Sequence, residues 1–353
     1  MNEDRNLNYD LIRLLGLIVI MIAHSSPPDW LFQLRNFGAP LLVFGSGLTY
    51  ALIYASREIQ TWTFYKKRLS KIILPAWIFL AFFFVSFYCA SVIAEKSFPF
   101  HAVQILKSFV FMQGIDFVWI FKIYVILALA TPICIYLNTH VANDKIYFLS
   151  LIAFYVLYEF LNQSLSPYLA GTIETIFDSI IFIVTPYFLI YLYAFRINRL
   201  RGSLVLILAT ISFVIFLGMA TVKYQEAGVF IQTQAFKYPP TLYYLSYAFF
   251  AINIIYLLVK NIDLTGARVK RTLIWLSSNA LWIYLWHIFA FYIWKFALKI
   301  QVGDLYLFVA KTLFLFGVGI ALTIFQNKLV SILSRQSDLF ARRLAPLLTN
   351  DKR

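Results

Sequence analysis

The chain has 353 residues, of which 61% are hydrophobic and 13% are charged, and its mean hydropathy is +0.78. A soluble domain carries about 25% charged residues, so these values exclude a water-soluble globular fold and predict a membrane protein. The formal net charge of +14 is explained by basic loops that meet anionic lipid, and it needs no nucleic-acid partner.

Stretches of about twenty apolar residues, each long enough to cross ~30 Å of hydrocarbon as a helix, recur along the chain. They do not alternate over about ten residues as the strands of a barrel would. We therefore predict an all-α, polytopic membrane protein with ten transmembrane helices at 9–26, 38–56, 72–94, 118–137, 146–162, 176–195, 202–220, 241–259, 280–298 and 305–327.

Ten spans place both termini on one side of the membrane. If that side is the cytoplasm, the inner segments hold 20 of the 30 Lys and Arg residues and the outer segments hold 6, with the other 4 inside spans. The positive-inside rule therefore predicts cytoplasmic termini. We predict one membrane domain over 1–330, followed by a basic cytoplasmic tail at 331–353. That tail either forms an amphipathic helix on the inner leaflet or is partly disordered.

Two ionisable side chains, Arg13 and His24, stand in the first predicted span with no other ionisable residue between them. At 100° per residue, eleven steps make three turns plus about 20°, so both lie on one helical stripe, ~16 Å apart along the axis. Such side chains in a membrane helix usually face a protein interior or a wet cavity and mark a site. The alternative is that Arg13 snorkels to the interface and His24 only ends the helix. Asp10 can pair with Arg13, three residues later.

The second predicted span begins Gly38-Ala-Pro40 and contains Gly45-Ser46-Gly47. Small residues allow close helix approach, which is the simpler interpretation. Ser46 adds a hydroxyl at that depth, but no visible base or Gly-x-Ser-x-Gly elbow supports a nucleophilic serine.

A basic run, Lys66-Lys-Arg68-Leu-Ser-Lys71, precedes Pro75 at the start of the third predicted span. Arg68 and Lys71 are i,i+3 neighbours and present two cations on one helix face. Positive-inside anchoring explains such a cluster equally well. The functional interpretation is a site for the phosphates of a cytoplasmic donor, because Arg binds phosphate oxygens bidentately and Lys adds a point charge.

The ninth predicted span carries a second intramembrane imidazole, His287, in the run Tyr284-Leu-Trp-His287. An imidazole at this depth indicates function, although a core histidine bonded to a neighbouring carbonyl is the alternative for it taken alone. Cys89 and Cys134 fall inside predicted spans and belong to no Cys/His motif, so we predict no metal site.

Taken together, these elements resemble the acyltransferase-3 family over about residues 6–330. The resemblance rests on Asp10-x-x-Arg13-x10-His24, the Gly-x-Pro and Ser-Gly elements of the second span, the basic run before Pro75, Trp119 with Pro132, and Tyr284-Leu-x-His287. The chain departs from the family pattern twice. The family's Arg-x-x-Arg is here Arg68-x-x-Lys71, which keeps the charge but loses a bidentate contact, and the aromatic pair before Ser-Gly is here Val43-Phe44-Gly45.

The resemblance implies a multi-pass bacterial inner-membrane enzyme that takes an acetyl group from cytoplasmic acetyl-CoA and delivers it to a hydroxyl of an extracytoplasmic or lipid-linked glycan. Arg13, Arg68 and Lys71 would then bind the phosphates of the donor. His24 would act as general base, or would transiently accept the acyl group. Ser46, or a backbone N–H near Gly47, is the candidate oxyanion partner. Candidate supporting residues are Asp10, Trp119 and His287.

Other classes of protein remain open from the sequence. A transporter or flippase for a lipid-linked sugar or small anion would also be polytopic with polar residues in its pathway, but the chain has no repeat symmetry. A glycan polymerase or ligase usually carries a large outer loop, whereas the longest outer connections here are 95–117 and 221–240. A purely structural protein would not need Arg13 and His24 on one stripe.

Overall fold

The structure is a computed structural model that describes residues 5–55, 59–112, 114–264, 266–298, 300 and 305–349. Within these residues the chain forms helices and no β-strand longer than an isolated bridge. The α-helices are α1 Leu7–His24, α2 Asp29–Leu34, α3 Gly38–Ile53, α4 Thr61–Ile93, α5 Ala102–Phe109, α6 Trp119–His140, α7 Asp144–Leu165, α8 Gly171–Ile176, α9 Phe182–Arg196, α10 Gly202–Ala227, α11 Leu242–Val259, α12 Ala267–Ile293, α13 Leu305–Gln336, α14 Asp338–Arg343 and α15 Ala345–Leu348. Short 3-10 or π-helical segments are η1 Ser166–Tyr168, η2 Phe177–Ile181, η3 Ile197–Arg199, η4 Thr233–Phe236 and η5 Trp294–Leu298.

Ten helical segments within the described residues are long and apolar enough to cross a membrane. Each corresponds to one predicted span, so the prediction of an all-α fold with ten spans is confirmed. Two helices begin well before the predicted span, α4 at Thr61 and α12 at Ala267. Their first turns are polar and basic, so hydropathy does not count these turns as part of a membrane span. The helical backbone nevertheless continues through them.

The chain divides into two compact units. Unit 1 comprises Met1–Ile20, Asp29–Ile59 and Ala130–Ile274, and unit 2 comprises Met21–Pro28, Gln60–Leu129 and Trp275–Arg353. Helices α1, α6 and α12 each contribute residues to both units.

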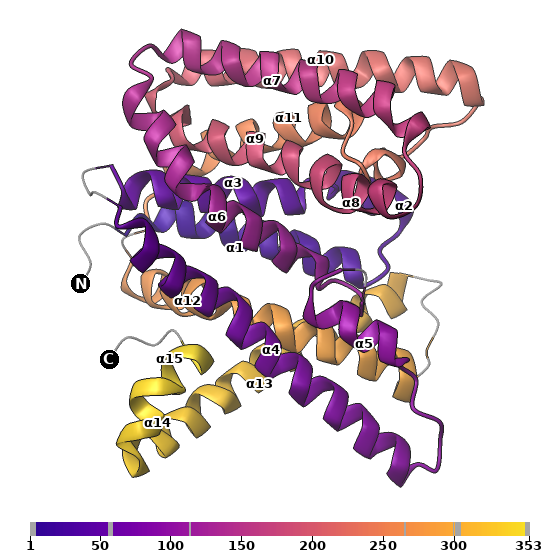
Figure 1. Ribbon diagram of the computed structural model, residues 1–353, viewed down its shortest axis with the longest axis vertical. Coiled ribbons are helices and arrows are strands. Elements are labelled where there is room, and N and C mark those ends of the chain that lie inside the picture. The colour runs from indigo at the N-terminus through magenta and orange to yellow at the C-terminus, as the bar shows by residue number, and fades with distance from the viewer. Residues whose placement is uncertain are drawn as a thin grey trace. The chain divides into compact units, whose positions relative to one another are not determined.

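In unit 1, α9 and α11 form a layer between α3 on one side and α7 and α10 on the other (Figure 1). The close contact of α3 with α9 depends on Gly47, because a Cβ there would lie 2.7 Å from the Ala194 Cβ. Gly228 caps the C-terminus of helix α10, and its φ of 70° lets the chain leave the helix in a left-handed conformation that glycine adopts without strain. Asn143 caps α7, and its side chain accepts hydrogen bonds from the N–H groups of Lys145 and Ile146.

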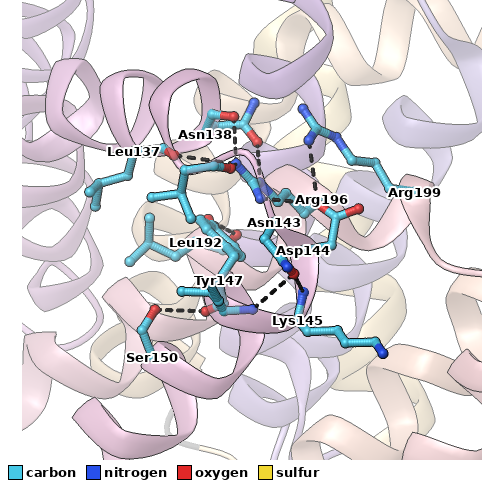
Figure 2. Close-up of polar contacts among 12 residues, drawn as sticks. Leu137, Asn138, Asn143, Asp144, Lys145, Tyr147, Ser150, Leu192, Arg196 and Arg199 are labelled. Atoms are coloured by element: carbon cyan, nitrogen blue, oxygen red, sulfur yellow. Dashed lines mark hydrogen bonds and ion pairs between the residues drawn. The ribbon is translucent and has the colours of Figure 1, made fainter.

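A buried arginine, Arg196, joins the end of α9 to the connection between α6 and α7 (Figure 2). Its side chain is 0% exposed. Each guanidinium nitrogen donates a hydrogen bond: Nε to Asn138 Oδ1 at 3.0 Å, Nη1 to Asp144 Oδ1 at 3.0 Å, and Nη2 to carbonyls that include that of Asn138 at 2.6 Å. The guanidinium also lies over the Tyr147 ring, 4.1 Å from its centroid. Every polar atom of this side chain is used within the protein, which identifies a structural residue.

In unit 2, aromatic side chains of α4 pack against α12. The rings of Phe79 and Phe82 meet Trp286 edge-on at 5.9 and 5.3 Å between centroids. Helix α13 approaches α12 closely at Gly319, where a Cβ would lie 3.2 Å from the Ile283 carbonyl oxygen. This contact brings α13 against the helical turn that carries His287.

The chain after residue 330 does not separate from unit 2 in the described residues. The predicted boundary at 330/331 falls inside α13, which continues to Gln336. Helices α14 and α15 then return to α12 and α13, where Trp282 Nε1 donates to the Leu347 carbonyl at 3.2 Å and Gln326 Nε2 donates to the Leu348 carbonyl. The basic tail is therefore held by its own unit, and its cytoplasmic location stays a prediction.

Candidate functional site

Arg13 lies on α1 in unit 1 beside a shared carboxylate. Asp10 is buried, and its two oxygens face Arg5 Nε at 2.6 Å and Arg13 Nη1 at 3.6 Å. The Arg13 side chain is 31% exposed, yet its Nε is buried without a hydrogen-bond partner among the described residues. One carboxylate of the described residues thus faces two cations at this end of α1.

The glycines of α1 and α3 explain how Arg13 fits in unit 1. A Cβ at Gly45 would lie 2.6 Å from Arg13 Cγ, and a Cβ at Gly16 would lie 2.8 Å from the Leu42 backbone nitrogen. Both distances are shorter than side chains tolerate, so the two helices can approach only because these positions are glycine. The small residues of the second span therefore position Arg13 in addition to packing helices.

His24 and His287 are in contact in unit 2, although 263 residues separate them in sequence. His24 is the last residue of α1 and is partly exposed, whereas His287 is fully buried on α12. His24 Nδ1 lies 2.7 Å from His287 Nε2, and the two rings are nearly parallel at 5.0 Å between centroids. The two imidazoles that the sequence singled out are thus in direct contact.

The hydrogen-bond partners fix which nitrogens carry protons. His287 Nδ1 faces the Tyr284 backbone carbonyl, which can only accept, so this nitrogen carries a proton. In a neutral His287 the other nitrogen, Nε2, is then an acceptor, and His24 Nδ1 must donate to it. When His24 is also neutral, its Nε2 is consequently the unprotonated nitrogen of the ring, which is the atom that a general base needs.

Phe117 and Tyr284 complete the wall around His24. The Phe117 ring stacks on the His24 imidazole at 3.5 Å between centroids and 21° between planes. Phe117 has a φ of 75°, a strained conformation for a non-glycine residue, and such strain clusters at functional sites. The Tyr284 hydroxyl donates to the Phe117 carbonyl at 2.7 Å. Tyr284 therefore supports both His287 and the segment that stacks on His24.

A buried cation, Lys311 on α13, belongs to the same unit. Its ammonium donates to Ser26 Oγ at 3.0 Å and lies 5.0 Å from the centroid of the Phe291 ring. That ring in turn meets Phe117 edge-on at 4.9 Å. Ser26 follows His24 by two residues, so a positive charge is held close in sequence to the imidazole. A fixed ammonium of this kind can stabilise an oxyanion.

The remaining predicted residues lie as follows. Ser46 is buried on α3 in unit 1, and its hydroxyl donates to the Leu42 carbonyl at 2.9 Å. Arg68 and Lys71 lie in unit 2 on α4, where Arg68 is partly exposed and Lys71 is exposed. Trp119 is the first residue of α6 and is partly exposed. The structure thus brings together His24 with His287, and Asp10 with Arg13.

Among the described residues, no group of three or more His, Cys, Asp or Glu is placed to hold a metal ion.

Sequence reasoning missed Phe117 and Lys311. For Lys311 a signal was present, because a lysine inside the tenth span is an intramembrane ionisable residue like Arg13 and His24. Phe117 carried no such signal, since its role depends on a backbone angle and on a stacking contact.

A family profile described as an acyltransferase domain matches residues 6–325 of the chain. No curated protein and no solved structure matches it.

Proposed function

This chain belongs to the acyltransferase 3 family and is a multi-pass membrane acyltransferase, and we propose that it O-acetylates glycans. The proposed reaction moves an acetyl group from cytoplasmic acetyl-CoA to a hydroxyl of an extracytoplasmic or lipid-linked glycan, such as capsule, O-antigen or exopolysaccharide. The observation that carries the proposal is the His24–His287 contact, because with both imidazoles neutral it leaves His24 Nε2 unprotonated on a partly exposed side chain.

The proposed chemistry is general-base catalysis by His24. Nε2 takes the proton of the acceptor hydroxyl as the hydroxyl oxygen attacks the thioester carbonyl. When the C–S bond of the tetrahedral intermediate breaks, the imidazolium returns the proton to the leaving thiolate, so the products are an O-acetyl ester and free CoA. His287 is a positioning residue in this scheme, because it holds His24 in the productive tautomer.

We propose that the donor enters from the cytoplasm, with Arg13, Arg68 and Lys71 as its phosphate ligands. The distribution of Lys and Arg supports cytoplasmic termini in a bacterial inner membrane, which places the Arg13 end of α1 inside and the His24 end outside. The ~16 Å rise between these two residues is a span that an extended pantetheine arm can largely cover.

Two side chains are proposed for the oxyanion. Ser46 is preferred to the backbone N–H groups near Gly47, because N–H groups inside the continuous helix α3 bond to carbonyls four residues earlier. Ser46 must turn away from Leu42 to act, whereas Lys311 is a fixed positive charge. If Lys311→Met lowers kcat more than Ser46→Ala does, Lys311 is the main oxyanion partner. The reverse order assigns the role to Ser46.

Inverted membrane vesicles test the reaction directly. Vesicles that contain the protein and an acceptor glycan receive acetyl-CoA labelled in the acetyl group on their outer, cytoplasmic face. We expect the label to appear as alkali-labile ester on lumenal glycan, and vesicles without the protein give the background. Uptake of label or of lipid-linked sugar without ester formation would contradict the acetyltransferase proposal. It would favour the alternative of a transporter or flippase.

A further inference from the structure

A second buried arginine, Arg35, lies between α2 and α3 in unit 1 and has no counter-ion among the described residues. It is 7% exposed, and its guanidinium lies over the Phe32 ring, 3.7 Å from the centroid. Its Nε and Nη2 are buried without a hydrogen-bond partner. A guanidinium removed from water needs hydrogen-bond acceptors, and the described part of the chain supplies none to these two nitrogens. An external anion is the group that would supply them.

A second cation, Lys237, is held near Arg35 by the segment that follows α10. Gln33 Oε1 accepts a hydrogen bond from the Thr233 N–H at 2.8 Å, and Asn36 Nδ2 donates to Thr233 Oγ1 at 2.8 Å. These bonds fix η4 and the residues after it against α2. Burial, and secondly the positive charge of Arg35, lower the pKa of Lys237 to about 7. The two cations therefore repel each other, and a bound anion would remove that repulsion.

The groups around these cations suit a carbohydrate. The hydroxyls of Tyr238 and Tyr244 lie near enough to Arg35 to interact with its charge. Three amide atoms of this region are buried without a hydrogen-bond partner in the described part of the chain: Gln33 Nε2, Asn36 Oδ1 and Gln234 Oε1. Sugar hydroxyls both donate and accept, so a mixture of amide N–H donors, amide oxygens and aromatic rings matches their chemistry.

The order of the spans places Arg35 and Lys237 at one membrane face. Arg35 stands near the start of the second candidate span, Asp29–Ile53, and Lys237 follows the seventh, Gly202–Ala227. The second to the seventh spans, six crossings, therefore separate them. An even number of crossings returns the chain to the same face, which is the face where the first span ends at His24. Under the proposed orientation this is the side of the acceptor glycan.

We infer that Arg35 and Lys237 form an oxyanion-binding site that recognises an acidic group of the acceptor glycan. The group is either the carboxylate of a uronic acid or the phosphate of a lipid carrier, both of which accept two hydrogen bonds from one guanidinium. The identity of the ligand in this inference rests on the proposed function. The existence of the site rests on Arg35 and the residues around it.

Binding without chemistry tests the site. The full-length protein is reconstituted in lipid nanodiscs without acetyl-CoA and titrated with a trisaccharide of galacturonic acid and with its methyl ester, which has the same shape but no charge. A second arm adds a polyprenyl phosphate and the uncharged polyprenol to the disc. We expect either the uronide or the lipid phosphate to bind about 10-fold or more tightly than its neutral counterpart, since a hydrogen bond to a charged group is worth about one to two factors of ten.

The variant Arg35→Gln should abolish this preference for the charged form, and Arg35→Lys should retain part of it. Arg201→Gln, at an exposed arginine of the same unit, is the matched control and should bind as wild type does. Thermal unfolding of each variant shows whether the fold is intact. A preference confined to the uronide identifies a sugar carboxylate, and one confined to the lipid identifies the carrier phosphate.

Equal binding of charged and neutral forms, or a preference that survives Arg35→Gln, would overturn the inference. The vesicle assay keeps this result separate from the proposed function. If acetyl ester forms equally on acidic and neutral acceptors in wild type and Arg35→Gln, the enzyme stands and the anion site fails. If Arg35-dependent anion binding is found but no ester forms, the anion site stands and the acetyltransferase proposal fails.

Discussion

Arg196 and Arg35 are both buried arginines of unit 1, and they differ in what surrounds the guanidinium. Arg196 donates to Asp144, to the Asn138 side chain and to backbone carbonyls (Figure 2), so its charge is neutralised and its N–H groups are used. Arg35 has an aromatic ring on one face and two buried nitrogens without a partner. Burial is therefore common to both arginines. Each guanidinium nitrogen of Arg196 has an acceptor, whereas Nε and Nη2 of Arg35 have none among the described residues.

The physical reason lies in the cost of an unpaired charge. A protein that only needs to hold its fold gains nothing from a buried guanidinium without acceptors, because desolvation is not offset. Arg13 is intermediate, since Asp10 lies 3.6 Å from its Nη1 while its Nε is buried and unpaired. The comparison therefore predicts that stability depends most on Arg196, and ligand binding on Arg13 and Arg35.

The largest effect on stability is expected from Arg196→Met. It removes the charge that neutralises Asp144 and leaves the carbonyls of the α6–α7 connection without donors, which costs about 3–5 kcal/mol of unfolding free energy. Chemical or thermal unfolding in a mild detergent measures the loss. Arg199→Met is the control three residues away, because Arg199 also faces Asp144, at 3.4 Å, but is 43% exposed. It should cost about 1 kcal/mol or less. Equal losses in the two variants would mean that a full set of hydrogen-bond acceptors does not distinguish an arginine that stabilises the fold.

Arg13→Lys should have a smaller effect, which concerns the binding of the donor acetyl-CoA. The lysine keeps the charge but loses the forked donor geometry, so the KM for acetyl-CoA should rise about 10-fold while the KM for the acceptor changes little. Initial rates at varied concentrations of each substrate measure the two constants, with Arg201→Lys as the exposed control. An equal rise in both constants would argue against donor binding at Arg13.

The smallest effect on stability is expected from Arg35→Met. Because two of its guanidinium nitrogens have no acceptor among the described residues, an apolar side chain of similar length should leave the unfolding free energy within about 0.5 kcal/mol of wild type or raise it. The same unfolding measurement applies. A loss comparable to that of Arg196→Met would show that Arg35 supports the fold. The two arginines would then not differ in their contribution to stability.

The sequence predicts the number and type of the membrane spans, because the length of an apolar run is set by the thickness of the bilayer. It predicts helix ends less well, as at α4, where the polar residues from Thr61 onward continue the helix ahead of the apolar run. Arg13, His24 and His287 are recognisable as ionisable residues in apolar segments. Their partners are not, since the approach of His24 to His287 joins the first and ninth spans. The lack of a partner for Arg35 Nε and Nη2 likewise appears only when the acceptors of the described residues are placed in space.

The most direct test of the account is the rate of acetyl transfer by His24→Ala in the vesicle assay, at saturating acetyl-CoA and with the unfolding temperature measured on the same preparation. Loss of the general base should lower the rate by about 10²–10⁴-fold with the fold intact. His287→Ala should lower it less, because His24 remains but its tautomer is no longer fixed. An intact His24→Ala protein that transfers acetyl groups at a rate within about threefold of wild type would contradict the account, since general-base loss costs at least about 10²-fold.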